Sequence, residues 1–490
     1  MEVLHVDRFS GKTGLTAEVL AILLYLALLV GVGVWSFKRD QTAHDFIIGS
    51  RSLNFWLTAL AAHASDMSSW LFMGFPAIIF TQGVSRSWFA VGLAFFMGLN
   101  WLFVAPKVRS QTEHYNSLTL SSFFENRFQD HSGKISLFTA LLSLIFYTIY
   151  ISAGMVGLGL LIESLFHIPY HIGITVGVII IIPYLFIGGY VTLAWLDCFQ
   201  GIFLLIMLIL VPSVAYVKVG GLAAIREVFA ERHLSLSMVP DHRFTTYLDL
   251  FFSIFGWGIG YFGQPHIITK FMGIAHSKEM KKSMIVGMSW QGLALTFATL
   301  VGIIGVPFFS NKGLEDSQLV FVNMVVDLFP PFVMAFILCA ILAATISTMD
   351  SQILVLASSL TEDFYKRIFH KEANSRERLW VSRMAILLTG LVSYLVAFFK
   401  VSSIYSLVCY AWSGLGSSFG PLLIFGLFSK RANKYGAWSG ILVGGGISLI
   451  WPYVSRFLPL FIPTLVPGFL CSSLAIYCVS LLTQSEGSRA

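Results

Sequence analysis

The chain has 490 residues, of which 56% are hydrophobic and only 11% are charged. Soluble domains carry roughly 25% charged residues, and a mean hydropathy of +0.79 implies more apolar surface than one water-soluble core can bury. The composition excludes a soluble enzyme and a disulfide scaffold, and it predicts a protein that spans a bilayer. The net charge of +6 comes from basic residues in short loops between apolar blocks, so it indicates membrane topology and not nucleic-acid binding.

Thirteen apolar blocks, separated by charged or turn-rich stretches, predict thirteen transmembrane helices. The first block has no small-residue cleavage site, so we expect a retained helix and not a signal peptide. Backbone groups in hydrocarbon must pair internally, and the blocks are too long for barrel strands, which predicts an all-α integral membrane protein. The predicted spans are 17–37, 55–83, 88–105, 135–164, 169–190, 195–217, 247–272, 283–308, 331–360, 381–400, 403–428, 435–454 and 462–483.

The distribution of basic residues predicts the orientation of these spans. Of the 31 Lys and Arg residues, 21 fall in one alternating set of loops, beginning with 38–54, and 10 fall in the other set. Cytoplasmic loops are enriched in Lys and Arg, so the richer set is predicted to be cytoplasmic. We therefore expect the N-terminus outside and the C-terminus in the cytoplasm.

The second span contains the string ASDMSS, which places a carboxylate among small and hydroxylated residues at membrane depth. An ionisable group there costs about 3 kcal/mol or more, so Asp66 should face a cavity, a partner or an ion. The serines also weaken the helix and free backbone carbonyls that a cation can take. The alternative is a buried Asp66 held by a hydroxyl or an Arg for packing alone.

The seventh span contains FGWGIGYFGQP, whose four glycines and one proline make a continuous helix improbable. Trp257 and Tyr261 are four residues apart and share one face, so both rings can line one cavity. Close helix packing through glycines is the alternative. Interrupted helices at corresponding positions of two halves indicate the midplane binding site of a transporter, so spans 2–6 and 7–11 are predicted to be inverted repeats.

The ninth span contains AILAATISTMDSQ, in which Ala344, Ser347, Thr348 and Ser351 fall on one helix face. Hydroxyls and carbonyls are hard oxygen ligands that suit a small monovalent cation better than a transition metal. Hydrogen bonding of these hydroxyls to the preceding turn is the alternative. Two further carboxylates can join a cation site, relay a proton or cap a helix end; they are Asp197 and Asp350.

Several long strings resemble the sodium/proline symporters of the solute:sodium symporter family. The strings are GSRSLNFWLTALAAHASDMSSWLFMGFP, ENRFQD, FYTIYISAG, FGWGIGYFGQPHI, AILAATISTMDSQ and TEDFYKR, and the resemblance runs from about Asp45 to the last span. It implies a LeuT-like five-plus-five inverted-repeat fold and sodium-coupled import of L-proline by alternating access. It also implies a bacterial cytoplasmic (inner) membrane, with sodium as the coupling ion and no organic cofactor.

The same resemblance implies roles for individual residues. The sodium ligands would be Ala64, Met67, Ala344, Ser347 and Thr348, with Asp66 important for sodium affinity and coupling. Asp197, Asp350 and Ser351 form a candidate second cation site. The proline-binding residues would be Ser68, Ser69, Tyr150, Trp257, Tyr261 and Pro265, and Arg51 and Arg127 would serve gating or topology.

The resemblance also predicts the domain organisation. Residues 1–490 form one transmembrane transporter domain: a peripheral helix at 17–37, repeats at 55–217 and 247–428, and two peripheral helices at 435–483. Three residues depart from the family pattern. His63 and Arg86 replace a small and an acidic residue, and Ser69 replaces a glycine in the proposed substrate region. The change at Ser69 leaves open another small carboxylate or amino-acid substrate, since one side chain can reshape a small pocket.

Other functional classes receive less support from the sequence. The five cysteines lie in apolar stretches without a CxxC pair, and the histidines form no HExxH pattern, so a metal site or a membrane enzyme is not expected. A solute-gated sensor is disfavoured because only eight residues follow Leu482. A channel would need a continuous pore and would not saturate with solute. The sequence does not predict the oligomeric state.

Overall fold

The computed structural model describes residues 12–37, 42–166, 168–187, 189–311, 313–370, 372–399, 401–458 and 462–483. Within these ranges the protein is all-helical, and its only β-type pairing is an isolated bridge between Leu53 and Ile274. The prediction of an all-α membrane protein is confirmed, since ten of the described helical segments are long and apolar enough to span a membrane.

The ten segments correspond to ten of the thirteen predicted spans. They are α1 (Lys12–Ser36), α5 (Trp88–Leu99) continued by α6 (Ala105–His114), α8 (Lys134–Phe166), α10 (Tyr190–Lys218), α14 (Met280–Phe308), α16 (Pro331–Ser359), α18 (Ser375–Phe398), α19 (Ile404–Phe428), α20 (Lys434–Val454) and α21 (Leu465–Leu482). Two of these segments run longer than predicted, because π-helical turns at Asn100–Val104 and Leu360–Tyr365 carry them on without a break.

The other three predicted spans are a shorter helix and two interrupted helices. Helix α9 is Tyr170–Ile187. The second span divides into α3 (Phe55–Met67) and α4 (Gly74–Gln82), and the seventh into α12 (Phe244–Gly258) and α13 (Pro265–Met272). Short helices connect the spans; they are α2 (Ala43–Ile48), α7 (Leu120–Phe128), α11 (Gly221–Glu231), α15 (Val320–Leu328) and α17 (Lys366–Ile368).

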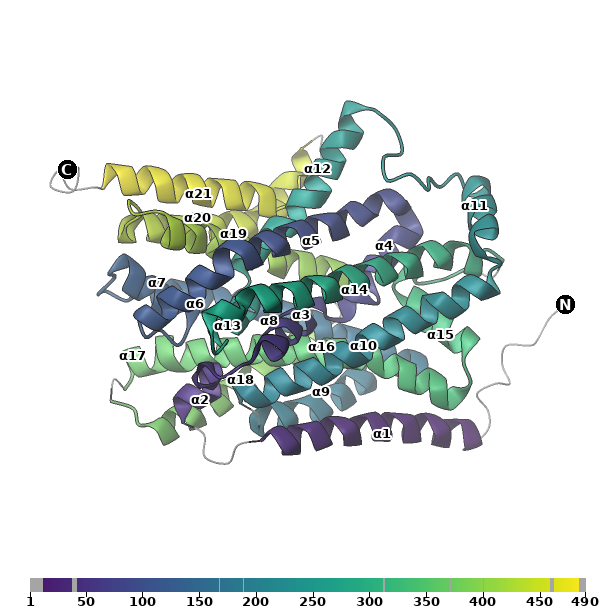
Figure 1. Ribbon diagram of the computed structural model, residues 1–490, viewed down its shortest axis with the longest axis horizontal. Helices are drawn as coiled ribbons and strands as arrows, with labels where there is room; N and C mark the ends of the chain where they lie inside the picture. Colours follow the sequence, from purple (N-terminus) through teal and green to yellow (C-terminus); the bar gives the residue numbers. More distant parts are fainter. Residues whose placement is uncertain are drawn as a thin grey trace.

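Burial separates central helices from peripheral ones. In the most apolar segments of α8 and α16, 83% of the residues are buried, against 22% in α1 and 33% in α20 and α21. In Figure 1, α1 lies along one edge of the bundle and α20 and α21 lie along the opposite edge, with α3, α8 and α16 between them. Two of these central helices carry the predicted sodium ligands, with Ala64 and Met67 on α3 and Ala344, Ser347 and Thr348 on α16.

Candidate functional site

The interruption between α3 and α4 has a defined geometry. Helix α3 ends at Met67, and Ser68 adopts φ 40° and ψ −172°, a conformation that no helix interior contains. The Ser68 backbone N–H donates to the Thr348 hydroxyl oxygen at 2.9 Å, and the Ser68 hydroxyl oxygen accepts the Trp70 N–H at 3.2 Å. Helix α16 therefore satisfies a backbone group that the break leaves without a helical partner.

A cluster of buried oxygen atoms lies where α3 meets α16. The Ser347 hydroxyl donates to the Ala64 carbonyl at 2.9 Å and to the Ala344 carbonyl at 3.1 Å. The Thr348 hydroxyl donates to the same Ala344 carbonyl at 3.0 Å. The structure thus brings together four predicted sodium ligands, and the fifth, Met67, is the last residue before the break. Uncharged hard oxygens of this kind suit a monovalent cation.

The interruption between α12 and α13 depends on glycines at close helix contacts. A 3₁₀ turn at Ile259–Gly263 joins the two halves, and Pro265 opens α13 at a position where its missing N–H costs nothing. A Cβ atom on Gly260 would lie 2.1 Å from Nε1 of Trp412, and one on Gly258 would lie 2.5 Å from the Gly92 carbonyl oxygen. The glycines therefore break the helix and also allow its close packing.

A small aromatic cavity lies between the two interruptions. Five of the predicted residues, Asp66, Met67, Tyr150, Trp257 and Tyr261, line it, together with Trp70, Leu93, Val408 and Trp412. The Tyr261 hydroxyl donates to the Asp66 carboxylate, and the Gln291 side-chain amide donates to the Tyr261 oxygen at 2.8 Å. Asp66 therefore faces a cavity, as predicted, and it also has the hydroxyl partner that the alternative interpretation named, from a residue of the cavity wall.

Three predicted substrate residues lie outside this cavity. Pro265 lines a separate cavity with Thr269, Ser358 and Ser359. Ser68 and Ser69 are buried beside the break, and the Ser69 hydroxyl packs against Gly157, whose added Cβ would lie 2.7 Å from it.

The two cavities have volumes of about 10 and 20 Å³. Each holds about one water molecule, so both cavities are closed in this structure and a larger solute requires them to open.

The predicted second cation site contains an ion pair that the sequence did not reveal. Lys270 Nζ lies 2.8 Å from an Asp197 carboxylate oxygen, and both side chains are at most 2% exposed. The Ser351 side chain lies beside the Asp197 carboxylate, and Asp350 is fully buried in α16. Lys270 lies at the end of the predicted span 247–272; it belongs to the last turn of α13, and its ammonium donates to Asp197 on α10.

The two arginines assigned to gating or topology bind backbone carbonyls of neighbouring segments. Arg51 donates to the carbonyls of Thr112, Met272 and Ser117 at 3.0 to 3.2 Å. Arg127 donates to the carbonyls of Gly426 and Ser429 at 2.7 Å. Neither makes a contact with the oxygen cluster in the part of the chain that the structure describes, so both join chain segments at one end of the bundle.

The two other departures from the family pattern each have a partner in the structure. His63 is fully buried behind the break, and its Nε2 accepts the indole N–H of Trp101 at 3.1 Å. Arg86 forms an ion pair with Asp249 at 3.0 Å, which ties the start of the third span to α12. A packing role therefore accounts for both side chains.

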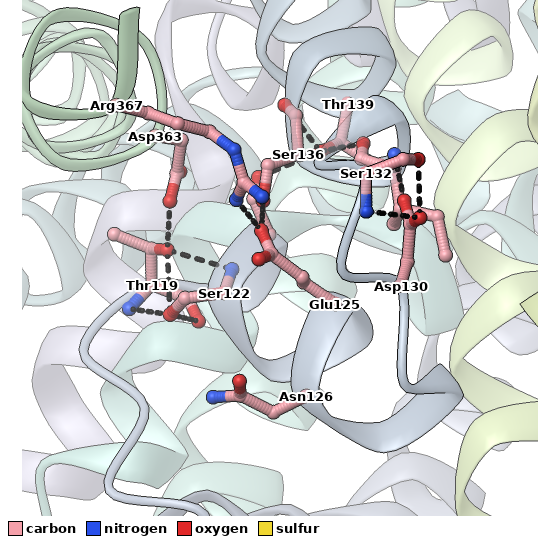
Figure 2. A network of polar contacts seen from close by, with 12 residues as sticks. Thr119, Ser122, Glu125, Asn126, Asp130, Ser132, Ser136, Thr139, Asp363 and Arg367 are labelled. Atoms are coloured by element: carbon pink, nitrogen blue, oxygen red, sulfur yellow. Dashed lines mark hydrogen bonds and ion pairs between the residues drawn. The ribbon is translucent and has the colours of Figure 1, made fainter.

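A polar network joins α7 to the end of α16, where the strings ENRFQD and TEDFYKR meet (Figure 2). Glu125 forms an ion pair with Arg367, and the Thr119 hydroxyl donates to Asp363 at 2.9 Å. The network borders a cavity of about 800 Å³. Burial opposes ionisation of Asp130, but hydrogen bonds from Ser132, Ile135 and Trp438 prevail and lower its pKa. This network lies at the end of the bundle predicted to be cytoplasmic.

Sequence reasoning missed six residues of the site, namely Trp70, Leu93, Val408 and Trp412 of the cavity wall and the polar Gln291 and Lys270. Gln291 carried a usable signal, since an amide inside the apolar span 283–308 must find a polar partner. The tryptophans carried none, because aromatic residues are common throughout the spans. Among the described residues, no group of three or more His, Cys, Asp or Glu side chains is placed to hold a metal ion.

An all-helical bundle with two interrupted helices at its centre, and with polar groups buried at both interruptions, defines a secondary active transporter of the LeuT-like fold. A family model for the sodium:solute symporter family matches residues 46–444. The chain belongs to this family, and it is a transporter and not an enzyme.

Relatives of this chain include bacterial proline transporters. The chain is 40% identical to the high-affinity proline transporter PutP of Bacillus subtilis, with 93% of this chain and 96% of the relative aligned. It is 38% identical to sodium/proline symporter 2 of Staphylococcus saprophyticus, with 95% and 93% aligned. The sodium/proline symporter of Staphylococcus aureus is 36% identical, with the same coverage.

Solved structures support the fold. A substrate-bound, outward-open sodium-coupled sialic acid symporter superposes with a TM-score of 0.81 at 22% identity, covering 96% of this chain and 98% of the other. Mhp1, a nucleobase-cation-symport-1 family transporter, gives a TM-score of 0.58 at 14% identity, with 92% and 98% covered. MhsT in complex with L-phenylalanine gives 0.55 at 15% identity, with 87% and 97% covered. At these identities the similarity concerns the fold alone.

Proposed function

We propose that this protein is a symporter that imports L-proline together with sodium by alternating access. The observation that carries the proposal is the arrangement around Ala64–Ser69. The oxygen cluster with α16 and the aromatic cavity with the α12–α13 break both adjoin this one short segment. A cation and a solute bound there would share a flexible element, which provides coupling between them. The proline transporters among the relatives support the choice of solute.

The sodium site consists of the carbonyls of Ala64, Met67 and Ala344 and the hydroxyls of Ser347 and Thr348. In the closed structure these hydroxyls donate to the carbonyls of Ala64 and Ala344, so sodium binding replaces hydrogen bonds with ion–oxygen contacts. The ion would bridge α3 and α16. Asp66 couples this site to the solute, because it belongs to the same break.

The solute site consists of Asp66, Tyr150, Trp257 and Tyr261, and the apolar ring of proline packs against the aromatic walls. Ser68, Ser69 and Pro265 join the site as the two interrupted helices separate, since they flank the breaks. The second cation site remains part of the proposal, at Asp197, Asp350 and Ser351. In the closed structure, Lys270 supplies the positive charge beside Asp197.

We also propose the domain organisation and the orientation in the membrane. Repeats at 55–217 and 247–428 each begin with an interrupted helix, and the least buried helices fall in the peripheral segments 17–37 and 435–483. The protein lies in a bacterial cytoplasmic membrane with its N-terminus outside and its C-terminus in the cytoplasm. Arg51 and Arg127, which hold backbone segments together, gate the cytoplasmic end.

Uptake of radiolabelled L-proline into proteoliposomes tests the function. An inward sodium gradient should drive uptake above equilibrium, and replacing sodium by potassium at the same pH should abolish accumulation. Competition by a panel of amino and imino acids, with and without sodium, identifies the solute. Equal uptake in sodium-free buffer would contradict the proposal. Stronger competition by another amino acid would show that this amino acid, and not proline, is the substrate.

A further inference from the structure

Asp66 is a buried carboxylate without a counter-charge from the protein. Its residue is 6% exposed, and its hydrogen-bond donor is the neutral Tyr261 hydroxyl. None of the ion pairs between described side chains involves Asp66. Burying an unpaired carboxylate is costly, and a cation from outside the protein bound beside Asp66 would offset that cost.

The surroundings of the Asp66 side chain differ from those of the oxygen cluster. The cluster contacts run between α3 and α16, through Ala64, Ser347 and Thr348. The Asp66 side chain instead contacts Tyr261, on the 3₁₀ turn of the other interrupted helix, and lines the aromatic cavity. The cation beside Asp66 therefore belongs to the solute cavity.

The cavity walls suit an organic cation. The Trp70 and Trp257 rings stack with centroids 5.1 Å apart, and the Trp412 ring lies 6.2 Å from Trp257 and 5.1 Å from Tyr261. Aromatic faces attract ammonium groups, most strongly where water is excluded. A carboxylate surrounded by such faces is complementary to an amine that carries apolar carbon atoms.

One residue that lines this cavity, Trp70, also carries an unused hydrogen-bond donor. The indole Nε1 of Trp70 is buried and has no hydrogen-bond partner among the described residues. A buried donor without an acceptor loses its hydration without compensation. A carboxylate on the solute would provide that acceptor.

We propose that Asp66 and Trp70 recognise the two charges of a zwitterionic α-amino acid. Asp66 binds the ammonium group, and the Trp70 indole N–H donates to the carboxylate. This inference rests on the proposed function, because it takes the aromatic cavity as the solute site. It assigns Asp66 to direct solute binding, so that Asp66 affects sodium only through the coupling of the two sites.

Ligand-induced thermal stabilisation of the purified protein tests the assignment, at saturating sodium. The ligands are L-proline, tetrahydrofuran-2-carboxylate, which lacks the ammonium, and L-prolinamide, which lacks the carboxylate. The unaltered protein should prefer proline over each analogue by roughly 100-fold or more, because each analogue leaves one buried group unpaired. In Asp66→Asn, the affinity for proline should fall to that for tetrahydrofuran-2-carboxylate. The same variant should still bind proline more tightly than prolinamide, wherever binding is detectable. Trp70→Phe should bind proline no more tightly than prolinamide, but it should still prefer proline over tetrahydrofuran-2-carboxylate.

Sodium titration without solute separates this assignment from a role in the ion site. Asp66→Asn should keep the sodium stabilisation of the unaltered protein even where its binding of proline is too weak to detect, whereas Thr348→Val should lose it. Asp66→Glu should restore the preference for ligands that carry an ammonium. Loss of sodium stabilisation in Asp66→Asn, or an unchanged preference for the ammonium, overturns the inference. If the unaltered protein responds to neither sodium nor proline, the proposed function fails instead.

Discussion

At the residue scale, Thr348 connects the two parts of the site. Its hydroxyl oxygen accepts the Ser68 N–H at the break and its hydroxyl donates to the Ala344 carbonyl. Thr345 is an equally buried threonine one turn earlier, and its hydroxyl bonds only to the Ile341 carbonyl within the described structure. The two residues therefore form a matched pair.

We predict that Thr348→Val raises the sodium concentration for half-maximal stabilisation by about tenfold or more, since it removes an oxygen ligand and a buried hydrogen bond worth about 1–3 kcal/mol. In Thr345→Val, the sodium concentration for half-maximal stabilisation should stay within about twofold of the value for the unaltered protein. Sodium titration of the purified variants measures both. Equal effects of the two substitutions would show that Thr348 acts through packing alone.

The buried pair of Lys270 and Asp197 gives a second prediction at this scale. Lys270→Met leaves a buried carboxylate unpaired and should destabilise the protein by about 3–5 kcal/mol. Asp197→Asn in the same chain should recover most of that loss. The exposed pair of Lys282 and Glu279, 3.7 Å apart, is the control, because Lys282→Met should change stability by about 0.5 kcal/mol or less. Thermal unfolding in detergent measures all three, and a stable Lys270→Met variant would contradict the expectation.

The sequence predicted the membrane-depth carboxylate and the aromatic pair better than it predicted their partners. Asp66, Trp257 and Tyr261 could be identified because a charge and clustered glycines are unusual inside apolar spans. Lys270 could not, since a lysine at the end of a predicted span is normally a topology signal. Only the structure, in which Lys270 pairs with Asp197 of α10 and is 2% exposed, shows that it is buried.

At the element scale, both interruptions follow from local sequence. Serines at the first break and glycines with Pro265 at the second weaken helical structure, and both breaks occur within the predicted segments. The π-helical turns that extend two other spans are less easily predicted, because their sequences NWLFV and LTEDFY contain no Gly or Pro. Pro106, which follows the first turn and lacks an N–H donor, is the one local signal.

Gly260 tests the role of close packing at the second break. Gly260→Ala forces a Cβ atom against the Trp412 ring, and we expect a loss of about 1–3 kcal/mol in stability together with weaker solute binding, because Trp412 is a cavity wall. Gly446→Ala is the matched control, since a Cβ there meets nothing within 4 Å. Thermal unfolding and solute titration compare the two. A neutral Gly260→Ala would show that the aromatic wall moves freely.

At the scale of the whole molecule, the pairing of distant segments determines the site. The strings ENRFQD and TEDFYKR are more than 200 residues apart, yet they form the network of Figure 2. Sequence periodicity contains no information on such contacts. The apolar blocks and the two interrupted spans predicted a helical bundle with inverted repeats, and the resemblance identified that bundle as LeuT-like. The closed state of both small cavities was likewise beyond the sequence, because it depends on how the two halves pack.

The ion pair of Glu125 with Arg367 should help to close the end that carries α7 and α17. Glu125→Gln should increase thiol labelling at Ser358→Cys, in the buried cavity beside Pro265, by about two- to fivefold, the effect expected for a partly exposed pair. The background must lack the five native cysteines, of which Cys478 is exposed. Lys366→Gln is the control, because Lys366 pairs with Glu362 on the same helical segment. Equal labelling in both variants would contradict a closing role.

The central claim is that sodium and solute bind on two sides of one interruption and are coupled through it. The most direct test measures the proline dissociation constant at several sodium concentrations, and the sodium concentration for half-maximal binding at several proline concentrations, in the same purified protein. Thermodynamic linkage requires that the factor by which sodium tightens proline binding equals the factor by which proline tightens sodium binding. We predict that both factors are about 5- to 150-fold, the usual range of such couplings. Proline binding that is independent of sodium would contradict the account.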